Sequence, residues 1–120
     1  MTSSASKITV GAVVAQFLEH CGVQAAFGVI SIHNMPILDA MNARGHVRFV
    51  MARGEAGAGN MADACARSTS SLGVCITSTG PAAGNIAGSL VEAYTAGTPL
   101  LHITGQIETQ YLDQKLSYIH

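Results

Sequence analysis

Four short, mainly apolar runs separated by stretches with helical spacing constrain the fold of this chain more than any other feature. The runs cover residues 23–28, 47–52, 72–77 and 99–104. Runs of this length and composition are typical of strands that are buried on both faces of a parallel sheet. Predicted helices over residues 10–21, 36–41, 56–67 and 82–95 alternate with them. This order predicts an α/β fold, a doubly wound parallel sheet with helices on both faces, because right-handed crossovers join parallel strands.

Apolar residues recur at helical spacing in two of the predicted helices. In the first helix, with Thr9 as N-cap and Gly22 as stop, they are Val10, Val13, Val14, Phe17, Leu18 and Cys21. In the fourth helix, one apolar face comprises Ile86, Ala87, Leu90, Val91 and Tyr94.

The 120 residues suffice for one domain, preceded by a polar tail over residues 1–8. We expect the domain, residues 9–120, to be incomplete at its C-terminus, since four strands leave the last strand at an open edge. The tail lacks the apolar core of a signal peptide, and no apolar run is long enough to span a membrane. The three cysteines have no CxxC spacing and lie in apolar segments, which favours a reduced, cytoplasmic protein.

The charge content limits the classes of partner that the chain is expected to bind. A net charge of −1 predicts neither nucleic-acid nor membrane binding. Charged residues make up only 11% of the chain, which indicates that part of its surface is normally covered by something else. The small-residue helix 56–67 is therefore either an ordinary buried helix or a subunit interface.

Glu55 stands where a predicted strand ends and a helix begins. Loops after residues 28, 52, 77 and 104 meet at the carboxyl edge of such a sheet, where ligands bind. Glu55 is either a group for proton chemistry or an acid stabilised by the helix dipole, and its position alone does not separate these interpretations. Of the histidines, His33 lies in a loop at this edge, whereas His102 is predicted to be a hydrogen-bonded core residue.

A glycine motif, residues 57–62, matches G-x-G-x-x-A and raises the alternative of a Rossmann-type nucleotide-binding domain. That site also needs an acid about 20 residues further on, and residues 72–81 contain none. The nucleotide alternative is therefore the weaker one. No recurring Cys, His or carboxylate spacing predicts a metal site.

Four segments carry a family resemblance, and they cover the chain from Thr9 to Gln106. They are residues 27–29 with 33–40, residues 53–55 with 61–67, residues 77–81 with Asn85, and residues 99–101 with 103–106. In order and spacing they resemble the N-terminal, pyrimidine-binding domain of thiamine diphosphate enzymes of the acetolactate synthase and benzoylformate decarboxylase type. The resemblance implies the thiamine diphosphate-binding fold with a flavodoxin-like start.

The resemblance also implies a reaction. The glutamate matching Glu55 hydrogen-bonds N1′ of the cofactor's aminopyrimidine, and this favours the tautomer that removes the C2 proton of the thiazolium ring. The activated carbon then attacks a 2-keto acid, leading to decarboxylation or to acetolactate synthase-like carboligation. Further cofactor contacts are implied for Ile30, Thr79, Gly80, Pro81 and Asn85. A substrate pocket is implied for Ser31, Ile32, His33 and Gln106.

Two departures from the family pattern matter. Gly54 stands where many relatives have histidine, and residues 30–32 replace a Pro-Gly-Gly-like segment, so the substrate pocket differs. The Gly-Asp-Gly…Asn motif that binds magnesium and diphosphate is absent, so Mg²⁺ is expected from a separate C-terminal domain or subunit. The family also implies a homodimer or tetramer with the cofactor between subunits. The isolated chain is then inactive, and the alternative is a non-catalytic assembly or binding module of the same fold.

Overall fold

A computed structural model describes residues 8–112 and contains a four-stranded parallel sheet, which confirms the predicted α/β architecture. The strands are β1 (Ala25–Gly28), β2 (Arg48–Met51), β3 (Gly73–Thr77) and β4 (Leu100–Thr104). Their order in the sheet is β2-β1-β3-β4, and every neighbouring pair is parallel. The sheet order therefore reverses direction between β1 and β3.

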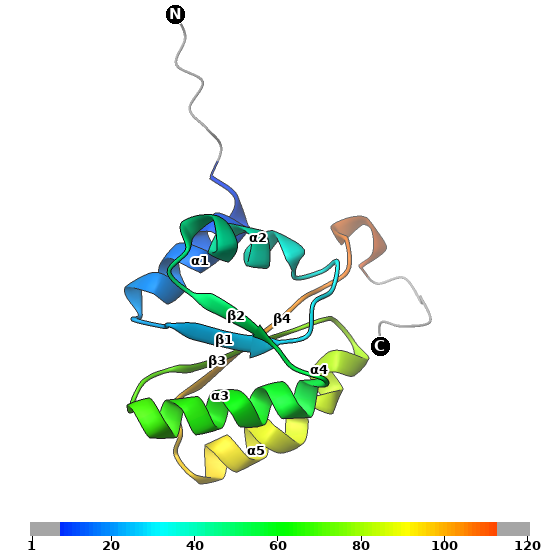
Figure 1. The fold of residues 1–120 in the computed structure, drawn as a ribbon. Helices are drawn as coiled ribbons and strands as arrows, with labels where there is room; N and C mark the ends of the chain where they lie inside the picture. The colour runs from blue at the N-terminus through cyan, green and yellow to red at the C-terminus, as the bar shows by residue number, and fades with distance from the viewer. Residues whose placement is uncertain (1–7, 113–120) are drawn as a thin grey trace, which may run out of the picture.

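Helices cover both faces of the sheet (Figure 1). Helices α1 (Val10–His20) and α2 (Met35–Arg44) lie on one face. Helices α3 (Glu55–Thr69), α4 (Pro81–Asn85) and α5 (Ala87–Thr95) lie on the other, and a 3₁₀ turn, η1 (Thr109–Tyr111), follows β4. The predicted order of elements is thus confirmed, with the strands one or two residues shorter than expected at several ends.

Each face of the sheet has its own core. Under α1 and α2, alternate strand residues such as Ala26, Val74 and Ile76 pack with Leu18 and Met41. Under α3 and α5, the intervening residues take part instead, with Cys75 packed beside Ala62 and Ile86. The alternation follows from the period of two along a strand, which sends successive side chains to opposite faces.

The single helix predicted over residues 82–95 is wrong, because the helix is broken at Ile86 into α4 and α5. The Ile86 amide bonds back to the Gly84 carbonyl and ends α4, while the Ile86 carbonyl accepts from Leu90 in the next helix. Gly84 and Gly88 flank the break, and each weakens a continuous helix by about 1 kcal/mol relative to alanine. Ile86 itself is fully buried, so the break directs this side chain into the core.

The predicted apolar face of α1 is only partly the buried one. Leu18 is buried and Val14 packs against the core, as expected, and Gly11 and Ala15 are buried with them, whereas Val10, Val13, Phe17 and Cys21 are exposed. The reason is close helix packing: a Cβ on Gly11 would collide with the Pro36 carbonyl at the start of α2.

The apolar face predicted for the fourth helix is also only partly right, because Ile86 and Leu90 take part in the core but three other members do not. Ser89 and Ala93 are buried, while Ala87, Val91 and Tyr94 are exposed. The contact with α3 selects the small residues, and apolar periodicity alone ranks side chains by hydrophobicity without measuring the distance between helices.

The cysteines divide by environment. Cys75 is buried, as expected of a small apolar residue, but Cys21 is exposed and Cys65 is half-buried. Across residues 8–112, the structure contains no helix with the length and apolar character that crossing a membrane requires.

Candidate functional site

The carboxyl edge of the sheet carries the predicted site residues. After β1 the chain continues through α2 to β2, which lies on one side of β1 in the sheet. After β3 it continues through α4 and α5 to β4, which lies on the opposite side of the sheet. Ligands of open α/β folds bind in the crevice at such a reversal, outside the carboxyl ends of the strands. The loops after β1 and β3 flank that point.

Glu55 is the first residue of α3, preceded by Gly54 in an extended conformation. Its side chain is half-buried, and Asn85 Nδ2 at the end of α4 donates to Glu55 Oε2 at 3.2 Å. No described residue donates a hydrogen bond to Oε1, which leaves an acceptor for a ligand. Glu55 is thus a helix-start acid, and its part in proton chemistry stays a prediction.

The turn after β3 contains Thr79, Gly80 and Pro81. Gly80 has φ 59° and ψ −117°, a conformation that favours glycine, and Pro81 then begins α4. Thr79 Oγ1 lies 3.5 Å from Gln106 Oε1, which also accepts from the Ile107 amide at 2.9 Å. The structure therefore brings Thr79 and Gln106 together, although they are 27 residues apart in sequence.

The loop after β1 is held by Asn34, a residue that the sequence analysis did not single out. Its side chain is 1% exposed; Oδ1 accepts from the Ser31 amide, and Nδ2 donates to the Val29 carbonyl, each at 2.9 Å. Both amide groups of this buried side chain are thereby satisfied, which fixes the loop. The sequence does contain a signal, since asparagine favours such turns and here precedes a helix.

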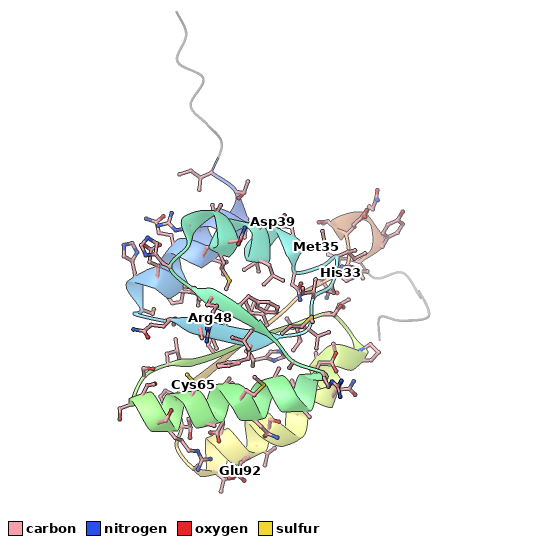
Figure 2. All side chains as sticks on the ribbon, in the orientation of Figure 1. His33, Met35, Asp39, Arg48, Cys65 and Glu92 are labelled. Atoms are coloured by element: carbon pink, nitrogen blue, oxygen red, sulfur yellow. The ribbon has the colours of Figure 1, made fainter. Side chains whose placement is uncertain are left out.

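Asn34 leaves two isoleucines of this loop exposed. Ile30 is 52% exposed and Ile32 is 77% exposed. His33 lies beside the loop that follows β4, because a Cβ placed on Gly105 would be 2.6 Å from His33 Cβ. Figure 2 shows His33 and Met35 at the end of the molecule where this loop enters α2.

The predicted site residues form two groups. One is Glu55 with Asn85; the other joins the turn after β3 to Gln106, with His33 beside Gly105. Within residues 8–112, no hydrogen bond directly joins a side chain of one group to a side chain of the other. The turn at Gly80 nevertheless connects them, because it leads into α4, whose last residue is Asn85.

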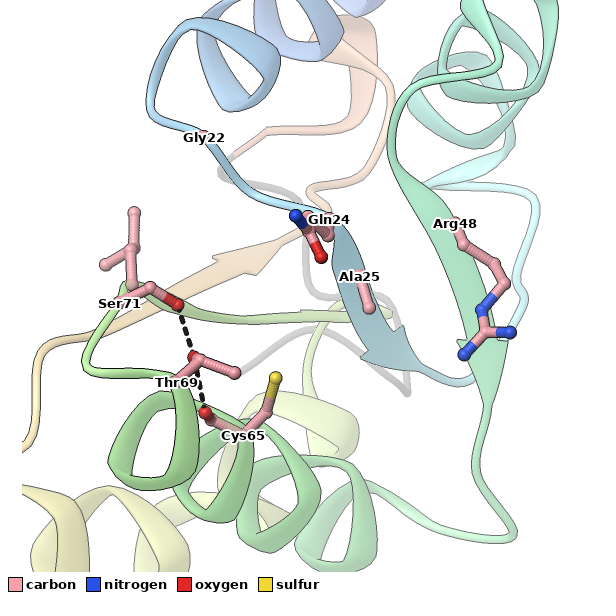
Figure 3. A pocket seen from close by; sticks show the side chains of 8 residues that line it. Gly22, Gln24, Ala25, Arg48, Cys65, Thr69 and Ser71 are labelled. Carbon is pink, nitrogen blue, oxygen red and sulfur yellow. Dashed lines mark hydrogen bonds between the residues drawn. The ribbon is translucent and has the colours of Figure 1, made fainter.

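A cavity of about 440 Å³ lies at the opposite, amino edge of the sheet. Arg48 from β2 lies on one side of it, and Cys65 and Thr69 from α3 lie on the other (Figure 3). The Thr69 hydroxyl donates to the Cys65 carbonyl and also lies 2.6 Å from Ser71 Oγ. None of the predicted site residues lines this cavity.

The geometry of α3 contradicts the nucleotide alternative. A dinucleotide fingerprint places its first glycines in the turn between strand and helix. Here α3 already begins at Glu55, so Gly57 and Gly59 lie inside the helix. In the part of the chain that the structure describes, no three His, Cys, Asp or Glu side chains gather into a group that could hold a metal ion.

Comparisons with known proteins give one consistent result. Residues 8–119 match the family described as thiamine pyrophosphate enzyme, N-terminal TPP binding domain. An acetolactate synthase from Arthrospira platensis is 40% identical over 93 residues, which cover 75% of this chain and 16% of that protein. The large subunit of acetolactate synthase isozyme 1 from Escherichia coli (strain K12) is 32% identical over 106 residues, covering 88% of this chain and 19% of that subunit.

A decarboxylase is similar as well. The "Probable 2-ketoarginine decarboxylase AruI" of Pseudomonas aeruginosa is 33% identical over 113 residues, which cover 94% of this chain and 20% of that protein. The chain therefore spans about a fifth or less of the length of these curated relatives.

Proposed function

Because the chain belongs to the thiamine pyrophosphate enzyme family and corresponds to its N-terminal TPP binding domain, we propose that it activates the cofactor of a lyase or transferase. The proposed substrate is a 2-keto acid, which undergoes decarboxylation or acetolactate synthase-like carboligation. The observation that carries the proposal is the Glu55 carboxylate, which begins α3 at the carboxyl edge and has Oε1 available. Acetolactate synthases and a decarboxylase among the relatives support this range of reactions.

The donors and the space around Glu55 fit the pyrimidine end of thiamine diphosphate. A carboxylate suits a ring nitrogen that carries a proton, since charge-assisted hydrogen bonds are short and strong. Gly54 and Gly84 both have open space where a Cβ would stand, which leaves room for a flat ring. When bound, thiamine diphosphate supplies the carbon nucleophile that attacks the keto group. The role of Glu55 is to hold a proton at the ring nitrogen, and Asn85 orients its carboxylate.

The remaining roles are divided between the loops. Ile30, Thr79, Gly80 and Pro81 are proposed to contact the cofactor with Asn85, because they come from the two loops that flank the strand-order reversal. Ser31, Ile32, His33 and Gln106 are proposed to line the substrate pocket. The contact of His33 with Gly105 supports a shared pocket, since it joins the loops after β1 and β4.

The site is proposed to be completed by a further domain or subunit that binds Mg²⁺ and the diphosphate. Glu55 is the only acid among the proposed site residues, whereas protein-bound Mg²⁺ usually takes one or two carboxylates together with phosphate oxygens. The isolated 120 residues are accordingly expected to show no turnover with thiamine diphosphate and Mg²⁺. Measurable turnover of the isolated chain would contradict this part of the proposal.

A homodimer or tetramer with the cofactor between subunits completes the proposal. Gly57 and Met61 on α3 and Gly88 and Val91 on α5 are exposed, and no atom lies near the Cβ positions of the two glycines. Met61→Asp is expected to lower the mass of the native protein in sedimentation, whereas Asn42→Asp on α2 leaves it unchanged. An unchanged mass in Met61→Asp contradicts this interface.

A cytoplasmic location is also proposed, and the three free thiols support a reducing compartment.

The test of the catalytic assignment is Glu55→Gln in the native protein that contains this chain. We expect turnover and C2-proton exchange of bound thiamine diphosphate to fall by about 100-fold or more, a usual size for loss of acid–base catalysis. Glu92→Gln is the matched control, because Glu92 is an exposed acid on α5 whose partner is Arg67. Undiminished turnover in Glu55→Gln would end the assignment.

The second candidate is a non-catalytic assembly or binding module with the same fold. The exposed apolar side chains Met61 on α3 and Val91 on α5 favour it, since they offer an assembly surface whether or not catalysis occurs. Turnover of the native protein that depends on Glu55 refutes this candidate. Oligomerisation without any C2-proton exchange supports it.

A further inference from the structure

His102 on β4 lies beside Thr77 on β3, and neither residue has a part in the proposed chemistry. In the register of the two strands Cys75 pairs with His102, so His102 faces the same side as Cys75 and Thr77, under α3 and α5. His102 Nε2 is 2.7 Å from Thr77 Oγ1. Thr77 is fully buried and His102 is half-buried, so this contact is largely shielded from water.

The hydroxyl hydrogen of Thr77 has two possible acceptors. Besides His102 Nε2, the Ser78 carbonyl lies 3.3 Å from Thr77 Oγ1. The same carbonyl accepts from Thr104 Oγ1 at 2.7 Å. Since a hydroxyl has one hydrogen, Thr77 donates either to His102 or to Ser78. The choice depends on whether Nε2 carries a proton.

We propose that His102 is a positioning residue, which sets through the Thr77 hydroxyl how the Ser78 carbonyl and the turn 79–81 are held. A neutral His102 with its proton on Nδ1 accepts from Thr77, and Ser78 is then held by Thr104 alone. A protonated His102 donates to Thr77, which turns the Thr77 hydrogen toward Ser78. The effect of this choice on catalysis rests on the proposed function, but the hydrogen-bond coupling does not.

The turn connects this choice to Glu55. Gly80 precedes α4 as its N-cap, in a positive-φ conformation, and its carbonyl accepts from the Ala83 and Gly84 amides. The next residue of α4, Asn85, donates to Glu55. A change at Ser78 therefore enters a short, hydrogen-bonded segment whose far end holds the proposed catalytic carboxylate.

Burial lowers the pKa of His102 from its ordinary 6.5, so the neutral form predominates at neutral pH. Hydrogen bonding by Arg67 lowers the pKa of Asp63 on α3, and this acid stays ionised in the range where His102 titrates. The titratable or charged groups on the elements around His102 are Cys75 on β3, Glu55, Asp63, Cys65 and Arg67 on α3, Glu92 and Tyr94 on α5, and Glu108 after β4.

The direct test is an NMR titration, between pH 8 and 5, of the native protein that contains this chain, segmentally ¹⁵N-labelled over these 120 residues. We expect the amide resonances of Thr79 and Gly80 to shift with the same midpoint as the His102 ring nitrogens, and that midpoint to lie below 6.5. Thr77→Val removes the hydroxyl at nearly constant shape, so the shifts of Thr79 and Gly80 lose this midpoint. Thr77→Ser restores it. Amide shifts in Thr77→Val that still follow His102, or no matching midpoint in the unaltered chain, overturn the proposal.

A second measurement covers the site and stays informative if Thr77→Val does not fold. In the native protein, His102→Leu is expected to weaken thiamine diphosphate binding about three- to tenfold, the usual size for one lost hydrogen bond, while His102→Gln recovers much of the affinity. Equal affinity in both His102 variants and the unaltered protein overturns the effect on the site. Glu55→Gln in parallel tests the proposed function. If Glu55→Gln leaves turnover unchanged, the proposed function is refuted, and the coupling between His102 and the turn is then judged from the NMR titration only.

Discussion

The two faces of the sheet are packed by different means. Under α1 and α2, large aliphatic side chains such as Leu18, Met41 and Ile76 fill the space, and each is at most 1% exposed. Under α3 and α5, small residues bring the backbones close together and polar groups are buried with them, among them Thr77 and Ser89. The first face supplies stability through apolar volume. The second face gives up some apolar area and gains hydrogen-bonded positions for Glu55 and Asn85.

Ser89 illustrates what close packing provides. Its Oγ donates to the Ala56 carbonyl in the first turn of α3 at 2.8 Å. This contact requires α5 to approach α3 closely, and Gly59 permits it, because a Cβ there would be 2.6 Å from Ser89 Cβ. The residue that follows Glu55 is thereby anchored from α5, while Glu55 itself is contacted from α4.

The largest expected effect is the difference in alkylation rate between Cys75, which is buried under α3 and α5, and Cys21, which is exposed. Burial raises the pKa of Cys75 from 9.0 to about 12, which lowers its thiolate fraction about 1,000-fold. Iodoacetamide at pH 8 is therefore expected to label exposed Cys21 rapidly and Cys75 only on unfolding, as measured by peptide mass spectrometry. Rapid labelling of native Cys75 would indicate that water reaches the core under α3 and α5, and would contradict the close packing described for this face.

The next effect tests the first face. Leu18→Ala removes a fully buried side chain from the core under α1, so the free energy of unfolding should fall by about 2–5 kcal/mol in urea denaturation. Val13→Ala is the control, because Val13 is 54% exposed on the same helix. A loss as small as the control's would show that apolar volume does not dominate this face.

A smaller effect tests the second face. Gly59→Ala forces a Cβ against Ser89 and Ile86, and overpacking of this kind costs about 1–3 kcal/mol. Gly57→Ala in the same helix has open space and should gain up to about 1 kcal/mol from helix propensity. Thermal unfolding of both variants measures the difference. Similar behaviour of the two variants would refute the close contact between α3 and α5.

The smallest expected effect is a pH dependence carried by the second face. Because burial lowers the pKa of His102, the folded chain binds fewer protons than the unfolded chain in the range between the folded pKa and 6.5. The stability that neutral His102 provides is complete above that pH and is lost as the pH falls through the folded pKa. His102→Gln should show a smaller loss of stability than the unaltered chain between pH 7 and 5, in urea titrations. Exposed His46→Gln should retain the loss, and an unchanged loss in His102→Gln would exclude this assignment.

The sequence predicts strand order and layers better than it predicts orientation. Apolar runs mark β1 to β4 because parallel strands are buried on both faces, and the structure confirms them. The same reasoning finds only part of the buried faces of α1 and α5, because it misses Gly11, Ala15, Ser89 and Ala93. Close contact between backbones selects small residues, and this distance depends on the neighbouring element, which local periodicity does not contain.

At the site, sequence order locates the loops but not their internal bonds. Glu55 and Asn85 are 30 residues apart, and their contact depends on how α3 and α4 pack, which no local pattern encodes. His102 was predicted as a hydrogen-bonded residue, and the bond to Thr77 confirms that prediction. Its link onward to Ser78 depends on the register of β3 and β4, which no local pattern encodes.

Because the helix is broken at Ile86, the Asn85–Glu55 contact can change without a change in the Ser89–Ala56 contact. Had residues 82–95 formed one rigid rod, withdrawing Asn85 from Glu55 would also have pulled Ser89 from Ala56. Because α4 and α5 are distinct, a ligand that competes for Glu55 displaces one exposed amide contact, and the packing of α5 on α3 persists. The carboxylate can thus exchange its protein partner for a ligand while the helix that carries it stays in place.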